Sequence, residues 1–406
     1  MPANRRVVIT GLGVVSSLGI GKSDFWRNII AGKSGIAEVT RFDVTDFPVH
    51  KAGEIKNFNS ADFLPKKICE RVGLGSQYAI IATMLAIEDA LLDVSKISAG
   101  DIGIIVGSTM GEIPSLELID KFWVKGGEGD IFNANIIKFP VNNLANSIAS
   151  FFSIEGLNYV IPTACAAGNY SIGYGFDLIR KGSKDLIFAG GADPLSRLAF
   201  TGFNRLFAMA PEKCQPFDKN RKGMMLGEGG AILVLEELEH AKKRSAHIYA
   251  EVLGYGLSCD AFNMTIPGEK GVIKVMEKAI KNSCIEKSDV DYVSAHGTGT
   301  GQNDKNETAA IKEVFGASAN SIPISSIKSM LGHTMGTASA LEAIACCLII
   351  ENGIIPPTIN YETPDSECDL DYVPNVARKK NVEVALNNSF AFGGNNACVA
   401  FGKLKS

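Results

Sequence analysis

Short, continuously apolar runs recur along this chain and alternate with longer stretches of helical periodicity. Several runs have the length of strands but no polar side, so we predict strands buried on both faces of a sheet. Helical spacing is clearest over 74–92, 171–181 and 339–350. The alternation predicts an α/β fold in which helices are layered around mixed sheets. The predicted strands are 7–10, 102–107, 157–161, 186–189, 231–235, 249–253, 290–295 and 397–401.

Two segments of the chain resemble each other, 160–182 and 323–353. Each has an apolar strand, a turn with a reactive residue, a Gly-rich opening, an apolar helix and a final Gly. An internal duplication would account for the length of the chain, and it would place Cys165 and His333 at facing helix N-termini. The charged segment 235–247 is the best midpoint, so we predict halves over 1–250 and 251–406.

Composition excludes several classes of protein. The formal net charge of -4 and the 21% of charged residues argue against a nucleic-acid binder. The nine cysteines contain no CxxC pair, which indicates a reduced cytoplasmic protein without a disulfide framework or a zinc site. Glycines interrupt the apolar N-terminus, which favours a strand and a Gly-rich turn over a signal peptide. No run reaches the roughly 18 apolar residues of a membrane span.

Cys165 is the strongest candidate for a nucleophile. It follows the apolar run 157–161 and opens a stretch of small residues with a helical pattern behind it. The N-terminus of a helix favours the thiolate, which is the form of cysteine that attacks carbon. The alternative is a buried structural cysteine, which is the common fate of a free thiol.

Two of the five histidines lie in Gly-rich turns. His296 follows an apolar strand in "HGTGTG", and His333 precedes a predicted helix in "SMLGHTMG". Loops after strands commonly carry the chemistry of α/β proteins. The other three, His50, His240 and His247, lie in polar stretches and are expected at the surface. The spacing of Cys165, His296 and His333 matches no metal motif, so no metal is predicted.

The motifs "TACAAG", "HGTGT" and "KSMLGH", in this order, resemble those of the β-ketoacyl-acyl-carrier-protein synthases of the thiolase superfamily. The likeness covers nearly the whole chain, including "ITGLGVVSSLG", "PFDKNRKGMMLGEGG" and "NSFAFGGNNA". It implies a duplicated, five-layered α-β-α-β-α fold and usually a dimer. It also implies substrates that are carried on the phosphopantetheine of acyl carrier protein, with no cofactor of the enzyme itself.

The resemblance implies a decarboxylative Claisen condensation. Cys165 would carry the acyl group, and His296 and His333 would bind the thioester oxygen of malonyl-carrier as it becomes an enolate. Lys328 with Glu342 would order the site, and the backbone N–H groups of Cys165 and Phe392 would hold the oxyanion. The remaining expected residues are Thr298 and Thr300 on the pantetheine amides, Phe392 as a gate, and Gly393 and Gly394 as its hinge.

Two positions depart from the pattern of the family. Asn263 stands where relatives commonly have His, near the expected pantetheine entrance. Met224 replaces a usual Phe beside the acyl site, and its flexibility would suit an unusual or unsaturated chain. An acidic carrier protein would dock on a basic patch, for which the sequence offers Lys66, Lys67 and Arg71.

Within the family, the run "GQNDKNETAA" resembles the catalytic ketosynthase subunit of type II polyketide synthases, which pairs with a chain-length-factor subunit. The competing interpretation is a homodimeric synthase of fatty-acid elongation. A non-catalytic scaffold subunit is the non-enzyme alternative. A degradative thiolase is disfavoured because Cys398 lacks a CxGGG motif, and a dinucleotide-binding oxidoreductase because the N-terminus lacks GxGxxG.

Overall fold

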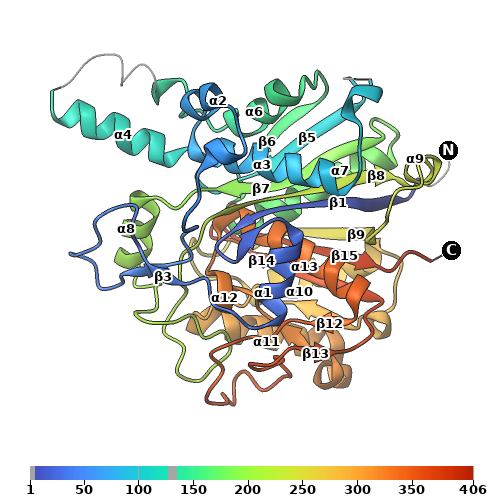
Figure 1. The fold of residues 1–406 in the computed structure, drawn as a ribbon. Helices are drawn as coiled ribbons and strands as arrows, with labels where there is room; N and C mark the ends of the chain where they lie inside the picture. The colour runs from blue at the N-terminus through green and yellow to red at the C-terminus, as the bar shows by residue number, and fades with distance from the viewer. Residues whose placement is uncertain (1–4, 99, 127–134, 406) are drawn as a thin grey trace.

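The computed structural model describes residues 5–98, 100–126 and 135–405. Its ribbon is layered, with helices between and outside two bodies of strands (Figure 1). Ten strands form one hydrogen-bonded path in the order β11-β10-β14-β15-β9-β1-β8-β7-β5-β6, and β2 pairs with β1. The strands are β1 Val7–Ser16, β2 Gly19–Ile20, β5 Ile102–Gly107, β6 Asn158–Ile161, β7 Leu186–Asp193, β8 Gly229–Glu237, β9 Ala250–Cys259, β10 Tyr292–Ser294, β11 Ile324–Ser325, β14 Val384–Phe390 and β15 Asn395–Gly402.

The strand order shows that the fold is duplicated. From β1 outward the first half runs β1-β8-β7-β5-β6, and from β9 outward the second half runs β9-β15-β14-β10-β11. When the five path strands of each half are numbered along the chain, they lie in the order first, fifth, fourth, second and third, so the two topologies are the same. The halves meet where β1 pairs with β9 over Val7–Ile9. The duplication expected from the sequence is therefore present, whereas the boundary at 250 remains a prediction.

Two helices form the layer between the halves, α7 (Ala167–Arg180) and α13 (Ala338–Asn352). They contact each other, and both contact strands of either half. Gly168 makes the close approach possible, because a Cβ on it would lie 2.7 Å from the amide nitrogen of Ala340. Since α13 is enclosed on all sides, its residues Ala338–Ile350 are all buried.

The segment Met335–Asn352 is long and apolar enough to cross a membrane by composition alone, which the search for apolar runs in the sequence missed. In the fold, 89% of this window is buried inside the protein. A helix with no solvent-facing side has to be apolar all round, so its composition reflects a place in the core.

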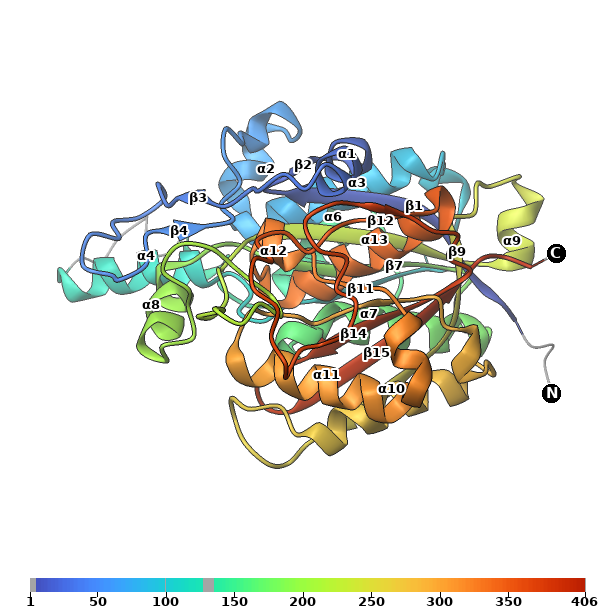
Figure 2. The ribbon, with the colours of Figure 1, turned by 90° about the horizontal axis from the view of Figure 1, so that it is seen from below.

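Helices also form the outer layers. On the first half, α3 (Leu74–Asp89) covers β1 and β8, and α6 (Asn143–Phe152) packs on β5. On the second half, α10 (Glu269–Asn282) covers β9 and β15 beside α11 (Gly301–Phe315), as Figure 2 shows. The buried residues of α10 recur every three or four positions, whereas its other side carries Glu and Lys side chains in solvent.

The remaining described elements surround these layers or connect them. They are α1 Lys22–Ile30, β3 Ala37–Glu38, β4 Lys51–Ala52, η1 Ser60–Asp62, α2 Lys66–Arg71, η2 Val94–Lys96, α4 Ile113–Val124, η3 Ala164–Ala166, α8 Arg197–Arg205, α9 Leu238–Lys243, η4 Lys287–Asp289, η5 Gly316–Ser321, α12 Lys328–Leu331, η6 Met335–Thr337, β12 Ile354–Ile355 and β13 Arg378–Lys379.

The N-terminal strand differs from its prediction. The glycines of "ITGLGVV" were expected to form a turn, but β1 continues through them to Ser16. Gly11 and Gly13 face α3, where a Cβ on Gly13 would lie 1.8 Å from the carbonyl oxygen of Ala82. These glycines therefore allow a helix to pack tightly on the strand, which is a use of glycine that local propensity does not distinguish from a turn.

We predict that Gly13→Ala destabilises the protein by about 3 kcal/mol, because the methyl group meets backbone that belongs to another element. Denaturant unfolding of the two proteins measures the difference. Gly202→Ala is the matched control, since Gly202 is exposed in α8 with no atom within 4 Å of an added Cβ. The control should be unchanged or more stable, and equal losses in both variants would contradict the packing argument.

Candidate active site

Cys165 lies in the short 3-10 helix η3, between strand β6 and helix α7. The preceding residue, Ala164, has a positive φ of 49°, which turns the chain sharply at this point. Cys165 is 7% exposed. Its carbonyl oxygen accepts hydrogen bonds from the hydroxyls of Ser389 at 2.9 Å and Ser339 at 3.3 Å. The turn is thus fixed by side chains from β14 and α13, both in the second half.

His296 lies two residues after the end of the short strand β10. Its backbone N–H and that of Gly297 each donate to the carboxylate of Glu307, at 2.8 Å. Glu307 comes from α11, which begins a few residues later. One buried carboxylate therefore holds the loop that carries the imidazole.

His333 lies between α12 and η6 and is 2% exposed. Its backbone N–H donates to the carbonyl of Met225 at 2.6 Å, and its own carbonyl accepts from Gly227 at 2.9 Å. The ring Nδ1 accepts a hydrogen bond from the backbone N–H of Met335 at 3.1 Å. A neutral ring whose Nδ1 is an acceptor carries its proton on Nε2, so His333 presents a donor to the cavity.

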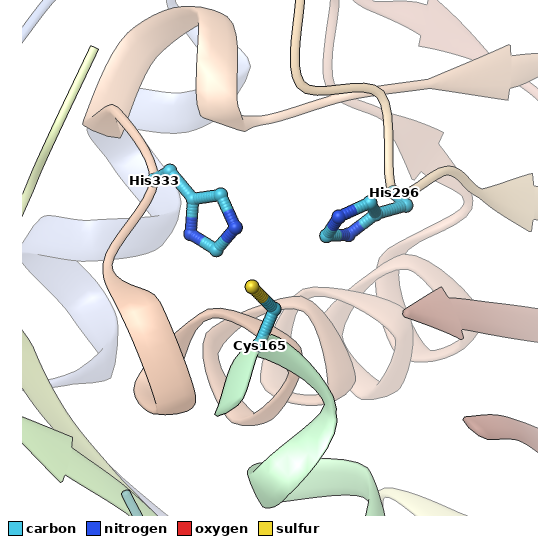
Figure 3. A group of neighbouring side chains, drawn as sticks. All are labelled: Cys165, His296 and His333. Carbon is cyan, nitrogen blue, oxygen red and sulfur yellow. The ribbon is translucent and has the colours of Figure 1, made fainter. Parts of the chain in front are cut away.

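The structure brings Cys165, His296 and His333 together. Their ligand atoms all lie within 4.8 Å of one another, and the thiol points into the space between the two rings (Figure 3). The ring centroids of the histidines are 5.5 Å apart at an angle of 84°. Cys165 and His333, which occupy similar places in the two resembling segments 160–182 and 323–353, thus lie close together in the structure.

Lys328 and Glu342 form a buried ion pair beside this group. Both residues are 1% exposed, so an ordinary surface lysine is ruled out. Burial raises the pKa of the Glu342 carboxyl, and the charge of Lys328 opposes that rise. The positive charge of Lys328 also acts on Cys165 and on both histidines.

Burial opposes the thiolate that the helix N-terminus was expected to favour. Burial raises the pKa of the Cys165 thiol to about 11, although Lys328 and the backbone N–H groups of Phe392 and Cys165 lower it. The N-terminus of α7 and the charge of Lys328 both favour the thiolate, but they do not offset the rise in pKa caused by the loss of water around the sulfur. A pKa in this range corresponds to a protonated thiol at neutral pH.

Both imidazoles are neutral at the same pH. Burial, followed by the charge of Lys328, holds the pKa of His296 and of His333 well below the usual range. Neutral imidazoles that present an N–H can donate hydrogen bonds to an oxygen that gains negative charge. The backbone N–H groups of Cys165 and Phe392 lie near the sulfur and are suited to a second oxyanion.

The same three side chains could be considered as metal ligands. However, the Nε2 of His333 carries a proton rather than a free electron pair, because its Nδ1 accepts the N–H of Met335. The group contains no carboxylate, and the cation of Lys328 acts on all three members. This donor set fits a site for a developing oxyanion better than a site for a cation.

A cavity of about 260 Å³ leads to the three residues. Thr298, Thr300 and Met224 line it, as the sequence predicted for substrate contacts. The two threonine hydroxyls are 2.8 Å apart, in the loop that precedes α11. Thr298 is buried, whereas Thr300 is half-buried nearer the mouth.

Phe392 also lines the cavity and is half-buried. Its ring lies 5.7 Å from that of Phe203, which belongs to α8. Gly393 and Gly394 have φ of 86° and 78°, so both use the left-handed region that glycine tolerates. They do not line the cavity themselves, which agrees with a backbone role beside Phe392.

Asn263 does not line the cavity. Its side-chain oxygen accepts hydrogen bonds from the backbone N–H groups of Thr265 at 2.8 Å and Ile266 at 3.1 Å. The side chain thus shapes its own exposed loop, from which Thr265 and Pro267 reach the cavity. An effect of Asn263 on substrate would be transmitted through this turn.

Lys66, Lys67 and Arg71 are exposed on α2, and none of them lines the cavity. Arg71 instead borders a small separate hollow with residues of α6, such as Asn143 and Ser147. The proposed basic dock is therefore accessible, but it does not adjoin the mouth in this chain.

Two buried acids of the site were missed from the sequence. Glu307 holds the loop that carries His296. The other acid, Asp193, ends β7, and its carboxylate accepts hydrogen bonds from the Ser108 hydroxyl and from the backbone N–H groups of Thr109, Met110 and Gly336. Burial raises their pKa to about 7 and about 6, respectively, although these hydrogen bonds lower it. A charged residue that directly ends a fully apolar strand, as in "LIFAGGAD", was an available signal for Asp193.

Comparison with protein families and curated proteins gives matches over most of the chain. The family "Beta-ketoacyl synthase, N-terminal domain" matches residues 4–241, and "Beta-ketoacyl synthase, C-terminal domain" matches residues 249–362. A 3-oxoacyl-[acyl-carrier-protein] synthase 2 of Staphylococcus aureus (strain COL) is 38% identical and covers 100% of both chains. The protein of the same name from Coxiella burnetii is 40% identical over 98% of this chain and 99% of its own.

Solved structures match equally completely. The ishigamide ketosynthase/chain length factor superposes with a TM-score of 0.95 at 42% identity, over 99% of this chain and 100% of that one. AntDE:AntF, a type II PKS acyl-carrier protein in complex with its ketosynthase bound to the hexaketide, gives a TM-score of 0.90 at 35% identity, with the same two coverages.

The raised pKa of Cys165 predicts how the alkylation rate of its thiol depends on pH. Its alkylation by iodoacetamide should accelerate about tenfold per pH unit between pH 7 and pH 9, because only the thiolate reacts. Mass spectrometry of the peptide that contains Cys165 measures the rate, and exposed Cys259 in the same digest monitors the reagent. A rate that levels off below pH 8 would show a resting thiolate instead.

The buried ion pair predicts a non-additive pair of variants. Lys328→Met should lower the free energy of unfolding by about 3–5 kcal/mol, since it leaves the carboxylate of Glu342 buried without a partner. Adding Glu342→Gln should restore much of that loss, as measured by denaturant unfolding. If the double variant is less stable than Lys328→Met alone, the ion pair is not the source of the loss.

Proposed function

Because the chain belongs to the β-ketoacyl synthase family, and is thus an acyltransferase that condenses carrier-bound acyl groups, we propose that it is the ketosynthase subunit of a type II polyketide synthase. The observation that carries the proposal is its likeness, over 99% of its length, to the ishigamide ketosynthase/chain length factor at 42% identity. The run 301–310, "GQNDKNETAA", supports the same subgroup.

In the first half-reaction, Cys165 takes the acyl group. The sulfur attacks the thioester carbonyl of an acyl-carrier protein, the bond to the pantetheine sulfur breaks, and the thiol proton ends on the departing arm. The N–H groups of Cys165 and Phe392 stabilise the oxyanion of the tetrahedral intermediate. Since the resting thiol is protonated, proton loss is coupled to attack, and the charge of Lys328 favours the thiolate as it forms.

In the second half-reaction, malonyl-carrier protein loses carbon dioxide. The electron pair of the broken carbon–carbon bond forms an enolate, whose oxygen is bound by the neutral imidazoles of His296 and His333. The enolate carbon attacks the acyl group on Cys165, and the thiolate leaves. The products are a 3-ketoacyl-carrier protein, carbon dioxide and, after uptake of one proton, the free thiol.

A second chain of the same fold would complete this enzyme at the open edge of the sheet. Strand β6 ends the path of described strands, with β5 as its hydrogen-bonded neighbour, and an edge strand of this kind can accept another strand. Tyr159 of β6 and Tyr174 of α7 are 46% and 41% exposed, with ring centroids 5.9 Å apart. Ile137 and Val141, in the segment before α6, are also exposed apolar side chains. These features support a partner that adds its own edge strand.

A homodimeric synthase of fatty-acid elongation is the second candidate. It is favoured by the curated relatives named 3-oxoacyl-[acyl-carrier-protein] synthase 2, at 38–40% identity. A scaffold subunit is disfavoured because Cys165, His296 and His333 converge in one cavity. Docking of acyl carrier protein on Lys66, Lys67 and Arg71, and a cytoplasmic location, belong to the proposal under either candidate.

The test is a condensation assay on the purified chain, with acyl-carrier and malonyl-carrier thioesters and intact-mass measurement of the protein. We expect no ketoacyl product from the chain alone, and product once a related subunit that lacks the cysteine is co-expressed with it. Cys165→Ala is the control for the acyl adduct, which it should lose. Efficient product from the lone chain would favour the homodimeric synthase, and no adduct under any condition would contradict both candidates.

A further inference from the structure

The mouth of the active-site cavity carries a lysine to which no function has been given above. Lys222 lines the cavity two residues before Met224, and it is exposed. It is the only charged side chain among the described lining residues, because the two histidines are neutral. A lone cation at the mouth of an otherwise neutral cavity is a recognition element for an anion.

The neighbouring cations are engaged elsewhere. Arg221 pairs with Asp365 and lies 3.9 Å from Asp304, whereas the charge of Lys219 acts on Asp365. For Lys222 the described part of the chain provides no ion pair or hydrogen bond. Its ammonium group is therefore available to a ligand, unlike that of its neighbour in sequence.

A second positive element borders the same mouth. Helix α11 begins at Gly301 after Thr300, and the side chain of Thr300 does not cap it. The first three residues of the helix, Gly301, Gln302 and Asn303, line the cavity, and their backbone N–H groups meet no acceptor among the described residues. The acid of this first turn, Asp304, is occupied by the N–H groups of Phe217 and Gly299.

The substrate brings one fixed negative charge to this place. A carrier-bound thioester enters at the end of a phosphopantetheine arm, and the arm is joined to the carrier protein through a phosphodiester. When the thioester lies at Cys165, the rest of the arm follows the cavity outward, so the phosphodiester belongs at the outer end. Lysine binds phosphate as a point charge, and helix N-termini bind it through free N–H groups.

We propose that Lys222, assisted by the first turn of α11, binds the phosphodiester of the phosphopantetheine arm and so positions the thioester at Cys165. Lys222 is a positioning residue, because it does not touch the reacting atoms. The inference rests on the proposed acylation of Cys165.

The experiment compares two small acyl donors that differ by a single phosphate, acyl-phosphopantetheine and acyl-pantetheine. Acylation of Cys165 is followed by intact mass for the unaltered protein and for Lys222→Gln. We expect Lys222→Gln to raise the half-saturating concentration of acyl-phosphopantetheine about fivefold, a loss of about 1 kcal/mol at an exposed site, with the maximal rate unchanged. The values for acyl-pantetheine should not change.

Lys219→Gln is the matched control. Lys219 is an exposed lysine three residues before Lys222, and it does not line the cavity, so the variant removes the same charge outside the site. It should leave both donors unaffected. Equal effects of Lys222→Gln on both donors, or no effect on either, would overturn the phosphate assignment. Acyl-carrier protein serves as a third donor. An effect of Lys222→Gln on this donor alone would assign Lys222 to carboxylates of the carrier and would also overturn the proposal. If neither donor acylates Cys165 in the unaltered protein, the proposed function itself fails.

Discussion

The close contact between α7 and α13 is the constraint on which the rest of this structure depends. Gly168 leaves no room for a side chain against Ala340, so the two helix N-termini, one from each repeat, are held side by side. Ser339 strengthens the contact, because its hydroxyl donates to the carbonyl of Cys165 and accepts the N–H of Asn169. This short contact helps to bring the thiol of Cys165 in one half close to the imidazole of His333 in the other.

The chemistry follows from burying this junction. Removal of water makes the thiol a weaker acid and the imidazoles weaker bases, so every reacting group is neutral at rest. The buried groups Lys328 and Glu342 are paired and fixed in position. Such a site has few dipoles to reorganise when an oxyanion forms, which is how preorganised hydrogen-bond donors accelerate a reaction.

The strands and helices that the sequence predicted well are those with one dominant signal. Strand β5 was predicted with its observed bounds, because "IGIIVG" is apolar on both faces and both faces are covered. Strand β14 was not predicted, since "VALNNSF" contains three consecutive polar residues, Asn387, Asn388 and Ser389, all fully buried. Asn387 bonds to Asn169 and Ser339, and Ser389 to Cys165. A strand whose polar side chains are satisfied by distant segments has no local signature. The same limit applies to the pKa of Cys165, which depends on what covers the sulfur rather than on the helix beside it.

The open edge at β6 has a consequence for how such a chain behaves in a cell. Without the proposed second chain, the edge offers unpaired backbone groups next to exposed Tyr159. An uncovered strand edge with apolar neighbours is a template for unintended association with other molecules. In the proposed heterodimer, simultaneous synthesis of the two subunits would therefore protect solubility, and an excess of this chain would be lost to aggregates.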